Sequence, residues 1–337
     1  MRRLKINQWI FVTVLGFLLI LLGPGTGPLT DTDAEAAWQP KKPITFVIMA
    51  GKGGGADRIA RLMQKIVQQH GWSPQPLIPV NKPGGAGAEA LRFLKDHHGY
   101  SHVIMVTLNS FFTTPLRANL GLSYRDFTPV ARMAMDTFIL WVNSNSPIEN
   151  VNEYVKAVKS KHGTWKMGGT GKGQEDSLVT GMLQEAYGIK TTYVPYKGGG
   201  KVASELIGGH VDSTVNNPSE QISWFEAGRS RPLAAFTPER LPQFPKVPTF
   251  QELGKGGMVY YMQRSINAPG GIPNAARQWY VELFTKLSKS EEWQTYCKKK
   301  ALHCTGELGF LTGRDLGKFF ATEDAKHKKL LKAMGEI

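Results

Sequence analysis

The stretch AGKGGGAD, residues 50–57, constrains the fold of this chain more than any other. The apolar run before it, at residues 44–49, is rich in β-forming residues and predicts a buried strand. After it, apolar residues recur at the spacing of one helix face and end before Gly71, which predicts an amphipathic helix. In such a half βαβ unit, the loop N–H groups and the positive helix end face one place and can hold an anion without a catalytic residue. The helical stripe comprises Ile59, Leu62, Met63, Ile66 and Val67.

The same order of elements recurs along the chain. Short apolar runs alternate with amphipathic stretches, and a second G-K-G loop lies at residues 170–173. This alternation favours an α/β fold with parallel-rich sheets that carry helices on both faces. Strands are predicted at residues 44–49, 77–80, 103–108, 138–143, 165–169, 191–195 and 211–215, and helices between them at 86–95, 151–160, 178–187 and 202–207.

The length of 337 residues, with 41% hydrophobic residues, is enough for two domain cores. Long helices are predicted at residues 274–287 and 315–334, after a proline-rich segment. We expect these helices to pack back on the first domain, because two chain crossings between domains make a hinge. The expected division is a signal peptide at 1–36, a first domain of 38–142 plus 265–337, and a second domain of 143–264.

The N-terminus has the pattern of a secretory signal peptide. A basic start, MRRLK, precedes an apolar run at residues 9–22, which is short for a membrane span. The small-x-small sequence AEA at residues 34–36 predicts cleavage near Ala36 and a periplasmic mature protein. The long distance from the apolar run to this site leaves an uncleaved anchor as the alternative.

The net charge of +14 at pH 7 favours anionic ligands or partners. A generically basic exported protein is the alternative. Nucleic acid is not expected as a partner, because an exported protein is separated from the nucleic acid of the cell. No recognised nucleic-acid-binding motif is present either. We expect the protein to be a monomer.

The two cysteines, Cys297 and Cys304, lie seven residues apart across the end of a predicted helix. In an oxidising compartment they could form a local disulfide, and two separate thiols are the alternative. His303 beside Cys304 does not complete any known zinc spacing, so no metal is expected.

Nucleotide motifs match this chain only superficially. Gly51, Gly53 and Ala56 fit G-x-G-x-x-A, but a dinucleotide site also needs an acidic residue at the tip of the second strand, where Asn81 stands. The loop at residues 170–173 lacks the first glycine and the magnesium-binding hydroxyl of a phosphate-binding loop. Nucleophile-elbow and zinc-protease motifs are missing as well. We therefore expect neither catalysis nor a cofactor.

Lys52 and Lys172 occupy equivalent points of the two glycine loops. They are either solvated or converge on a cleft, where they would suit a ligand with more than one carboxylate. Acidic residues follow in the first helical turn, Asp57 after one loop and Glu175 with Asp176 after the other. These acids either complement the helix dipole, worth about 0.3–1 kcal/mol, or orient loop N–H groups or receive a ligand hydroxyl or amine.

In this order and spacing, the motifs resemble the extracytoplasmic solute receptors of the tripartite tricarboxylate transporter family, the Bug group. The resemblance covers nearly all of the chain after the signal peptide. It implies a two-domain periplasmic binding protein (type II-like) that closes on a small di-, tri- or aromatic carboxylate and delivers it to integral membrane permease subunits. The motifs are KPITFVIMAGKGGGAD, VNKPGGAGAEA, YRDFTPVARM, GGTGKGQED, VPYKGGG, GGHVDSTVNNPSE and LPQFPKVPTFQELG.

Two departures from the family pattern bear on the ligand. Ala50 stands where many members carry an aromatic residue, and residues 174–176, QED, replace small hydroxyl residues, so the ligand could differ from a plain dicarboxylate. An NAD(P)-dependent enzyme and a ligand-sensing interaction protein are the alternative functions. The candidate ligand-binding residues are Gly51, Lys52, Gly53, Gly54, Gly55, Ala56, Asp57, Ser110, Thr170, Gly171, Lys172, Gly173, Gln174, Glu175, Asp176, Tyr196, Lys197, Gly198, Asn216 and Asn217.

Overall fold

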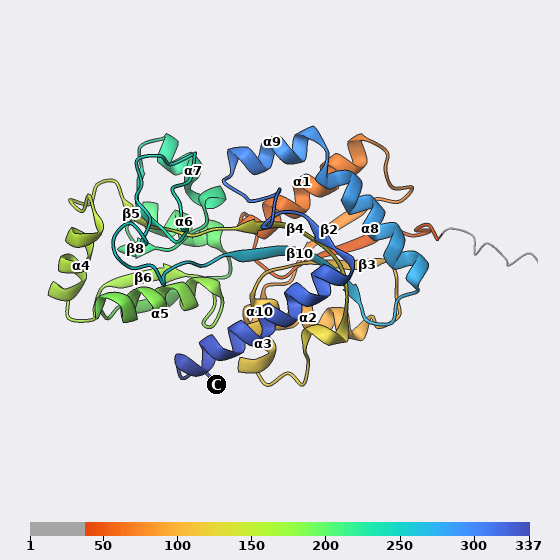
Figure 1. Ribbon diagram of the computed structural model, residues 1–337, viewed down its shortest axis with the longest axis horizontal. Helices are drawn as coiled ribbons and strands as arrows, with labels where there is room; N and C mark the ends of the chain where they lie inside the picture. The colour runs from red at the N-terminus through yellow and green to blue at the C-terminus, as the bar shows by residue number, and fades with distance from the viewer. Residues whose placement is uncertain (1–37) are drawn as a thin grey trace, which may run out of the picture. The chain divides into compact units, whose positions relative to one another are not determined.

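The computed structural model describes residues 38–337. The predicted signal peptide and its cleavage near Ala36 lie outside these residues. The described chain is an α/β protein with a six-stranded and a five-stranded sheet, and helices lie on both faces of each (Figure 1).

The first sheet is mixed, with the order β11-β4-β10-β3-β1-β2. β1 pairs in parallel with β2 and β3, whereas β10 runs antiparallel between β3 and β4. The sequence of β1, ITFVI, is almost entirely apolar because helices cover both faces of a strand in this position. The strands are β1 (Ile44–Ile48), β2 (Leu77–Asn81), β3 (Val103–Thr107), β4 (Phe127–Asp136), β10 (Met262–Pro269) and β11 (Leu311–Thr312).

The second sheet has the order β7-β6-β8-β5-β9. β6 is parallel to β7 and β8, and β5 is antiparallel to both of its neighbours. The chain passes from the first sheet to the second between β4 and β5, and returns between β9 and β10. The strands are β5 (Ile139–Asn143), β6 (Lys166–Gly169), β7 (Thr192–Pro195), β8 (Ser213–Thr214) and β9 (Ser230–Ala235).

The predicted strands and helices are confirmed within a few residues, but α3, α7, β4, β9 and the two-residue β11 were not predicted. α3 has eight residues and contains Pro115, and β4 contains Pro129 and the buried charges of Arg132 and Asp136. The short length and the proline of α3, and the proline and buried charges of β4, interrupt the apolar periodicity from which helices and strands are predicted. The helices are α1 (Gly55–Gln69), α2 (Ala88–Asp96), α3 (Ser110–Arg117), α4 (Val151–Ser160), α5 (Glu175–Tyr187), α6 (Gly199–Ile207), α7 (Pro218–Glu226), α8 (Asn274–Ser288), α9 (Glu291–Lys299) and α10 (Gly313–Ala333), with 3-10 turns η1 (Gly84–Gly87) and η2 (Tyr124–Asp126).

The C-terminal helices pack on the first sheet and its helices. α8 contacts β4, α9 contacts α1, and α10 contacts α3 and β4. Cys297 in α9 forms a disulfide with Cys304. Of the two possibilities left open by the sequence, a local disulfide and two separate thiols, the disulfide is therefore correct. The disulfide fastens the segment after α9 to the end of that helix.

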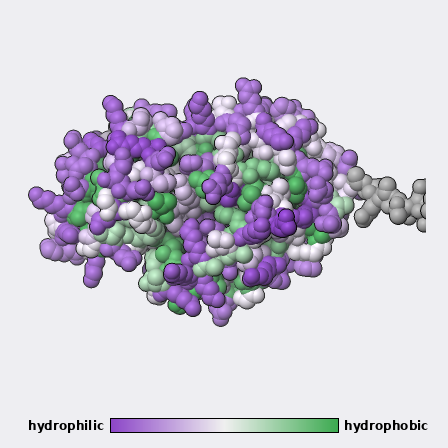
Figure 2. Space-filling view, in the orientation of Figure 1, coloured by the Kyte–Doolittle hydropathy of each residue, from purple (hydrophilic) through white to green (hydrophobic). Residues whose placement is uncertain are grey.

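The surface seen in Figure 2 is mostly hydrophilic, and hydrophobic residues appear on it in separate patches. The exposed large hydrophobic residues come from distant parts of the chain, which is normal for a globular surface. No helix within residues 38–337 combines the length and the apolar character needed to cross a membrane. These exposed residues are Ile78, Tyr100, Phe225, Leu253 and Ile337.

Candidate functional site

A small cavity lies where loop one (residues 50–57) and loop two (residues 170–176) face each other between the two sheets. Its volume of about 30 Å³ has room for about two water molecules. The cleft is therefore nearly closed in this structure. The lining residues are Ala50, Gly54, Gly55, Ala56, Leu108, Met262 and Arg264 from the first-sheet side, and Thr170, Gln174, Glu175, Asp176, Lys197, Gly198, Gly199, Asn217 and Glu220 from the second-sheet side.

Loop one is held by the carboxylate of Asp57, a buried residue in the first turn of α1. Its Oδ2 accepts a hydrogen bond from the backbone N–H of Gly53 (2.9 Å). Its Oδ1 accepts from Arg61 Nε (2.9 Å) and Asn81 Nδ2 (3.0 Å), so the charge is compensated. Gly53 has φ +76°, a conformation that favours glycine because a Cβ would clash with the backbone.

Loop two is built in the same way around the start of α5. Gly173 has φ +73°, and the side chain of Gln174 accepts a hydrogen bond from the backbone N–H of Gly171 (2.7 Å). Asp176 Oδ2 accepts from the backbone N–H of Thr170 (3.0 Å). Asp57 and Asp176 therefore share one local role, which is to orient the N–H groups of their own loops.

The two sides meet through backbone atoms at the rim of the cavity. The N–H of Gly51 donates to the carbonyl oxygen of Lys197 (2.9 Å). A Cβ at Gly51 would lie 2.5 Å from that oxygen, and a Cβ at Gly200 would lie 2.5 Å from the carbonyl oxygen of Gly53. Glycine at these positions permits the close approach of the two backbones.

Carboxylates from the second-sheet side occupy two helix N-termini on the first-sheet side. Glu220 Oε1, in α7, accepts a hydrogen bond from the N–H of Gly55, the first residue of α1 (2.9 Å). Glu175 accepts from the backbone N–H of Ser110, the first residue of α3. A helix N-terminus favours an anion, and here the chain supplies that anion itself.

Arg264 of β10 is the buried cation of the site. Its Nη2 and Nε atoms donate to Asp136 at the end of β4, and Nη2 also donates to Asn217 Oδ1 (3.1 Å). Nη1 has no hydrogen-bond partner within residues 38–337. Arg264 therefore connects the end of β4 and Asn217 at the cavity, and its Nη1 remains available to a ligand.

The buried carboxylates of the second-sheet side are poorly compensated. Burial raises the pKa of Glu175 and of Glu220, and burial together with the charges of Glu220 and Glu175 raises the pKa of Asp176 well above its usual range. No ion pair joins any of these three side chains to a lysine, arginine or histidine of the described chain. Negative charge is therefore costly here unless a cation is added.

Several sequence-predicted residues lie outside the cavity lining. Lys52 and Lys172 are exposed on their loops and do not line it. The hydroxyl of Tyr196 donates to Glu205, and Asn216 supports the site indirectly, because its Nδ2 donates to Glu220 (2.8 Å). The remaining predicted residues outside the lining are Gly51, Gly53, Asp57, Ser110, Gly171 and Gly173, which shape the loops or their contacts.

Sequence reasoning missed Glu220, Arg264, Gly199 and two apolar lining residues, Leu108 and Met262. Glu220 had a local signal, because Asn217 and Glu220 form the capping box of α7. Arg264 had none, since a single basic residue in a strand does not reveal that it is buried. It is 1% exposed.

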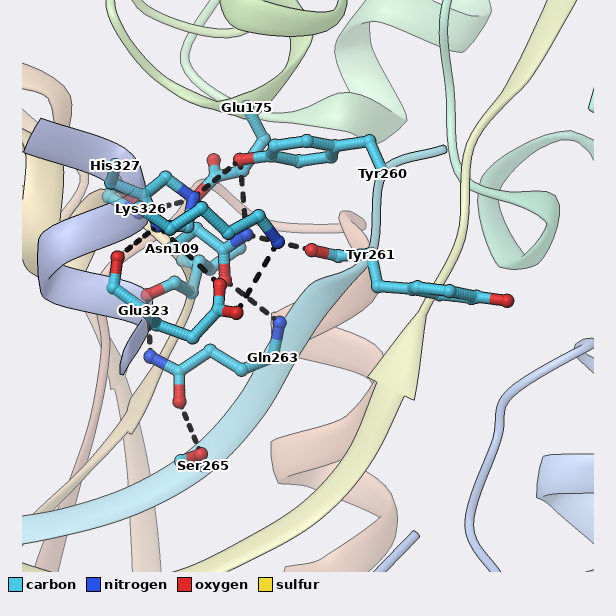
Figure 3. A network of polar contacts seen from close by, with 11 residues as sticks. Asn109, Glu175, Tyr260, Tyr261, Gln263, Ser265, Glu323, Lys326 and His327 are labelled. Atoms are coloured by element: carbon cyan, nitrogen blue, oxygen red, sulfur yellow. Dashed lines mark hydrogen bonds and ion pairs between the residues drawn. The ribbon is translucent and has the colours of Figure 1, made fainter. Parts of the chain in front are cut away.

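A buried polar network lies behind Glu175 and fixes the segment before α3 (Figure 3). Asn109 Nδ2 donates to Tyr260 Oη (3.0 Å), which contacts His327 Nε2 of α10 (3.0 Å), and Asn109 Oδ1 accepts from the N–H of Gln263 (3.0 Å). Burial lowers the pKa of His327 to about 4, so this histidine is neutral at pH 7. The network thus ties α10 and β10 to the start of α3, and His327 adds no charge to it at pH 7.

Metal chemistry finds no support in this part of the chain. Residues 38–337 contain no group of three or more His, Cys, Asp or Glu side chains arranged to hold a metal ion. The acids of the cavity instead bind backbone N–H groups.

The fold is that of a two-domain periplasmic binding protein. BugD, a periplasmic binding protein, superposes with a TM-score of 0.81 at 22% identity, covering 88% of this chain and 98% of its own. Rpa4515 of R. palustris, solved with adipate, gives 0.80 at 23% identity and the same coverage. MatC of Rhodopseudomonas palustris, solved with bound malate, gives 0.74 at 21% identity, covering 87% of this chain and 99% of its own.

The chain belongs to the tripartite tricarboxylate transporter family receptors, whose family model matches residues 59–336. The UPF0065 protein in the gbd 5′ region of Cupriavidus necator is 26% identical over 310 residues, which are 90% of each chain. BugT of Bordetella pertussis strain Tohama I is 24% identical over 272 residues, 79% of this chain and 80% of its own. The family is one of solute receptors rather than enzymes.

Proposed function

We propose that this protein is an extracytoplasmic receptor that captures a small organic carboxylate and delivers it to a tripartite tricarboxylate-type membrane permease. The observation that carries this proposal is the enclosed cavity between two glycine loops, each at the start of a helix and each from a different sheet. Membership of a receptor family and the adipate and malate bound to two proteins of similar fold agree with it.

The ligand enters when the two sides of the cleft separate. The present cavity of about 30 Å³ is too small for a solute such as adipate, so binding requires a more open arrangement. The ligand then bridges the two loops, and its higher affinity for the closed arrangement supplies the free energy of closure. The moving bodies are residues 38–142 plus 265–337 on one side and 143–264 on the other.

The site binds without catalysis and without a cofactor. Residues 1–36 act as a signal peptide, so the receptor works in the periplasm and meets its permease there. We expect it to act as a monomer. The contacts to the ligand come from the cavity-lining residues of the two loops, Gly54, Gly55, Ala56, Thr170 and Gln174, from Arg264 and Asn217, and from the acids that line the cavity.

A thermal-shift screen of the mature protein against mono-, di- and tricarboxylates, aromatic carboxylates and amino acids tests this function. A ligand at about 100 times its Kd should raise the unfolding free energy by about 2.7 kcal/mol. Adipamide, the uncharged analogue of adipate, is the matched control and should give no shift. Stabilisation by NAD or NADP with no response to the other compounds would instead support a dinucleotide-dependent enzyme.

A further inference from the structure

The two walls of the cavity carry opposite electrostatic character. The first-sheet wall presents the N-terminus of α1 and the guanidinium of Arg264. The second-sheet wall presents the carboxylates of Glu175, Asp176 and Glu220. Lys197 also belongs to this wall, but it is exposed and forms no ion pair with the three acids within the described chain. A ligand that bridges these walls meets hydrogen-bond donors on one side and carboxylates on the other.

The first-sheet wall has an unused donor for an anionic group. Arg264 is 1% exposed and lines the cavity, and its Nη1 has no partner within the described residues. Buried donors are almost always satisfied, and a guanidinium N–H pairs best with a carboxylate. A carboxylate of the ligand would accept the hydrogen bond that Arg264 Nη1 does not make within the described chain.

The second-sheet wall repels a second carboxylate. Its three acids are buried and accept hydrogen bonds from N–H and amide donors. The charge of Arg264 on the opposite wall offsets only part of the effect of burial, so the pKa of Glu175 and of Glu220 stays raised, and no cation offsets the raised pKa of Asp176. A plain dicarboxylate would add negative charge to this wall, whereas an ammonium group would neutralise it. The three NH donors of an ammonium also match the number of carboxylates gathered here.

We propose that the ligand of this receptor carries an ammonium group as well as a carboxylate, an inference that rests on the receptor function proposed above. The ligand carboxylate binds Arg264 Nη1 and takes the place of Glu220 at the N–H of Gly55. The ammonium binds Asp176 and Glu175. The ligand class is therefore a small zwitterion of the amino acid type.

Isothermal titration with four-carbon compounds that differ in their charged groups tests this proposal. The probes are succinate, butyrate, 2-aminobutyrate, 4-aminobutyrate and 1,4-diaminobutane, and the pair adipate and 6-aminohexanoate repeats the comparison in a longer chain. At least one aminocarboxylate should bind about tenfold or more tightly than the dicarboxylate of its own length, as expected for a hydrogen bond to a charged group.

The outcomes separate this proposal from the receptor function. Equal or tighter binding of the dicarboxylates would overturn the zwitterion proposal and leave the receptor function intact. Tight binding of 1,4-diaminobutane alone would also overturn it, because no carboxylate would then be needed. Absence of binding by every probe would count against both.

Asp176→Asn tests the ammonium contact directly, with Glu185→Gln as the matched control. Both changes remove one negative charge from α5, but Glu185 is exposed and does not line the cavity. Asp176→Asn should weaken aminocarboxylate binding about tenfold or more and should not weaken succinate binding. Glu185→Gln should change neither.

The melting temperature of each ligand-free variant checks that it is folded. If Asp176→Asn does not fold, Glu175→Gln takes its place with the same expected loss. Unchanged aminocarboxylate affinity in a folded Asp176→Asn or Glu175→Gln variant would overturn the proposal.

Discussion

The two glycine loops have nearly the same backbone but opposite charge balance. Gly51-Lys52-Gly53 matches Gly171-Lys172-Gly173, and the residues that precede each helix, Gly54 (φ −77°, ψ 171°) and Gln174 (φ −78°, ψ 175°), have almost equal angles. Loop one continues with Gly-Ala-Asp and loop two with Glu-Asp-Ser.

This difference decides what each loop offers to a ligand. Asp57 is neutralised by Arg61 and Asn81, so loop one leaves the helix N-terminus as its main electrostatic feature. Glu175 and Asp176 form no ion pair within the described chain, and burial raises the pKa of both, so loop two faces the cavity with two carboxyl groups whose negative charge is costly. Similar loops can thus present opposite charges, because the side chains of the first helical turn dominate over the backbone.

Arg264→Met should have the largest effect, because it removes the cation shared by both sides. Asp136 would remain buried without its partner, and the unfolding free energy should fall by about 3–5 kcal/mol. Urea denaturation followed by tryptophan fluorescence measures this. The double variant Asp136→Leu with Arg264→Met should recover most of the loss. An equal loss in both variants would show that the ion pair is not the cause.

Asp57→Asn should weaken the compensated loop. The amide cannot accept hydrogen bonds from Gly53, Asn81 and Arg61 with both of its terminal atoms, and the loss should be about 1.5–3 kcal/mol. Denaturant unfolding at pH 7 provides the measurement. A loss below that of the exposed Glu185→Gln change would mean that loop one does not depend on this carboxylate.

Gly51→Ala should separate the two backbones at the rim. Its Cβ would lie 2.5 Å from the carbonyl oxygen of Lys197, which is backbone and cannot swing away. Overpacking of this kind costs about 1–3 kcal/mol and should lower ligand affinity as well. Gly171→Ala is the matched control, because its Cβ would meet side-chain atoms, the oxygen of Gln174 at 2.9 Å and Cβ of Ala86 at 3.1 Å, rather than a backbone oxygen. Comparable losses of unfolding free energy in both variants would argue against a close backbone contact between Gly51 and Lys197.

Asp176→Asn should stabilise the ligand-free protein slightly, the reverse of Asp57→Asn. It removes one of three buried acids that repel each other, and a gain of about 1 kcal/mol would raise the melting temperature by about 2–4 °C. A lower melting temperature would show that the carboxylate is compensated in a way that the contacts do not reveal.

The pH dependence of this gain follows from the raised pKa of Asp176. Below the pKa of an unfolded aspartate, about 4, the side chain is protonated in both states and the variant should match the wild type. As the pH rises, the unfolded wild-type chain loses its proton before the folded one, so wild-type stability falls relative to Asp176→Asn. Glu175 and Glu220 face the same cavity and add to the same trend. Unfolding curves at pH 4 to 8 measure the difference, and a constant difference would contradict it.

The sequence by itself determined the parts that depend on neighbours along the chain. The strands before both loops, the glycines with positive φ and the first helical turns follow from local periodicity and backbone sterics. The order of motifs also indicated the receptor family. Neighbouring residues are sufficient to predict these features, because the interactions that determine each of them join residues only a few positions apart.

Only the tertiary structure decided how the loops are used. Glu220 lies 165 positions from Gly55, and Arg264 lies 128 positions from Asp136, so neither contact has a local signal. The sequence suggested that the N-terminus of α1 binds an anion of the ligand, whereas in the fold the carboxylate of Glu220 binds there. Burial then changes the chemistry of the acids, because removal from water raises the pKa of Glu175 and Asp176 and makes their negative charge costly.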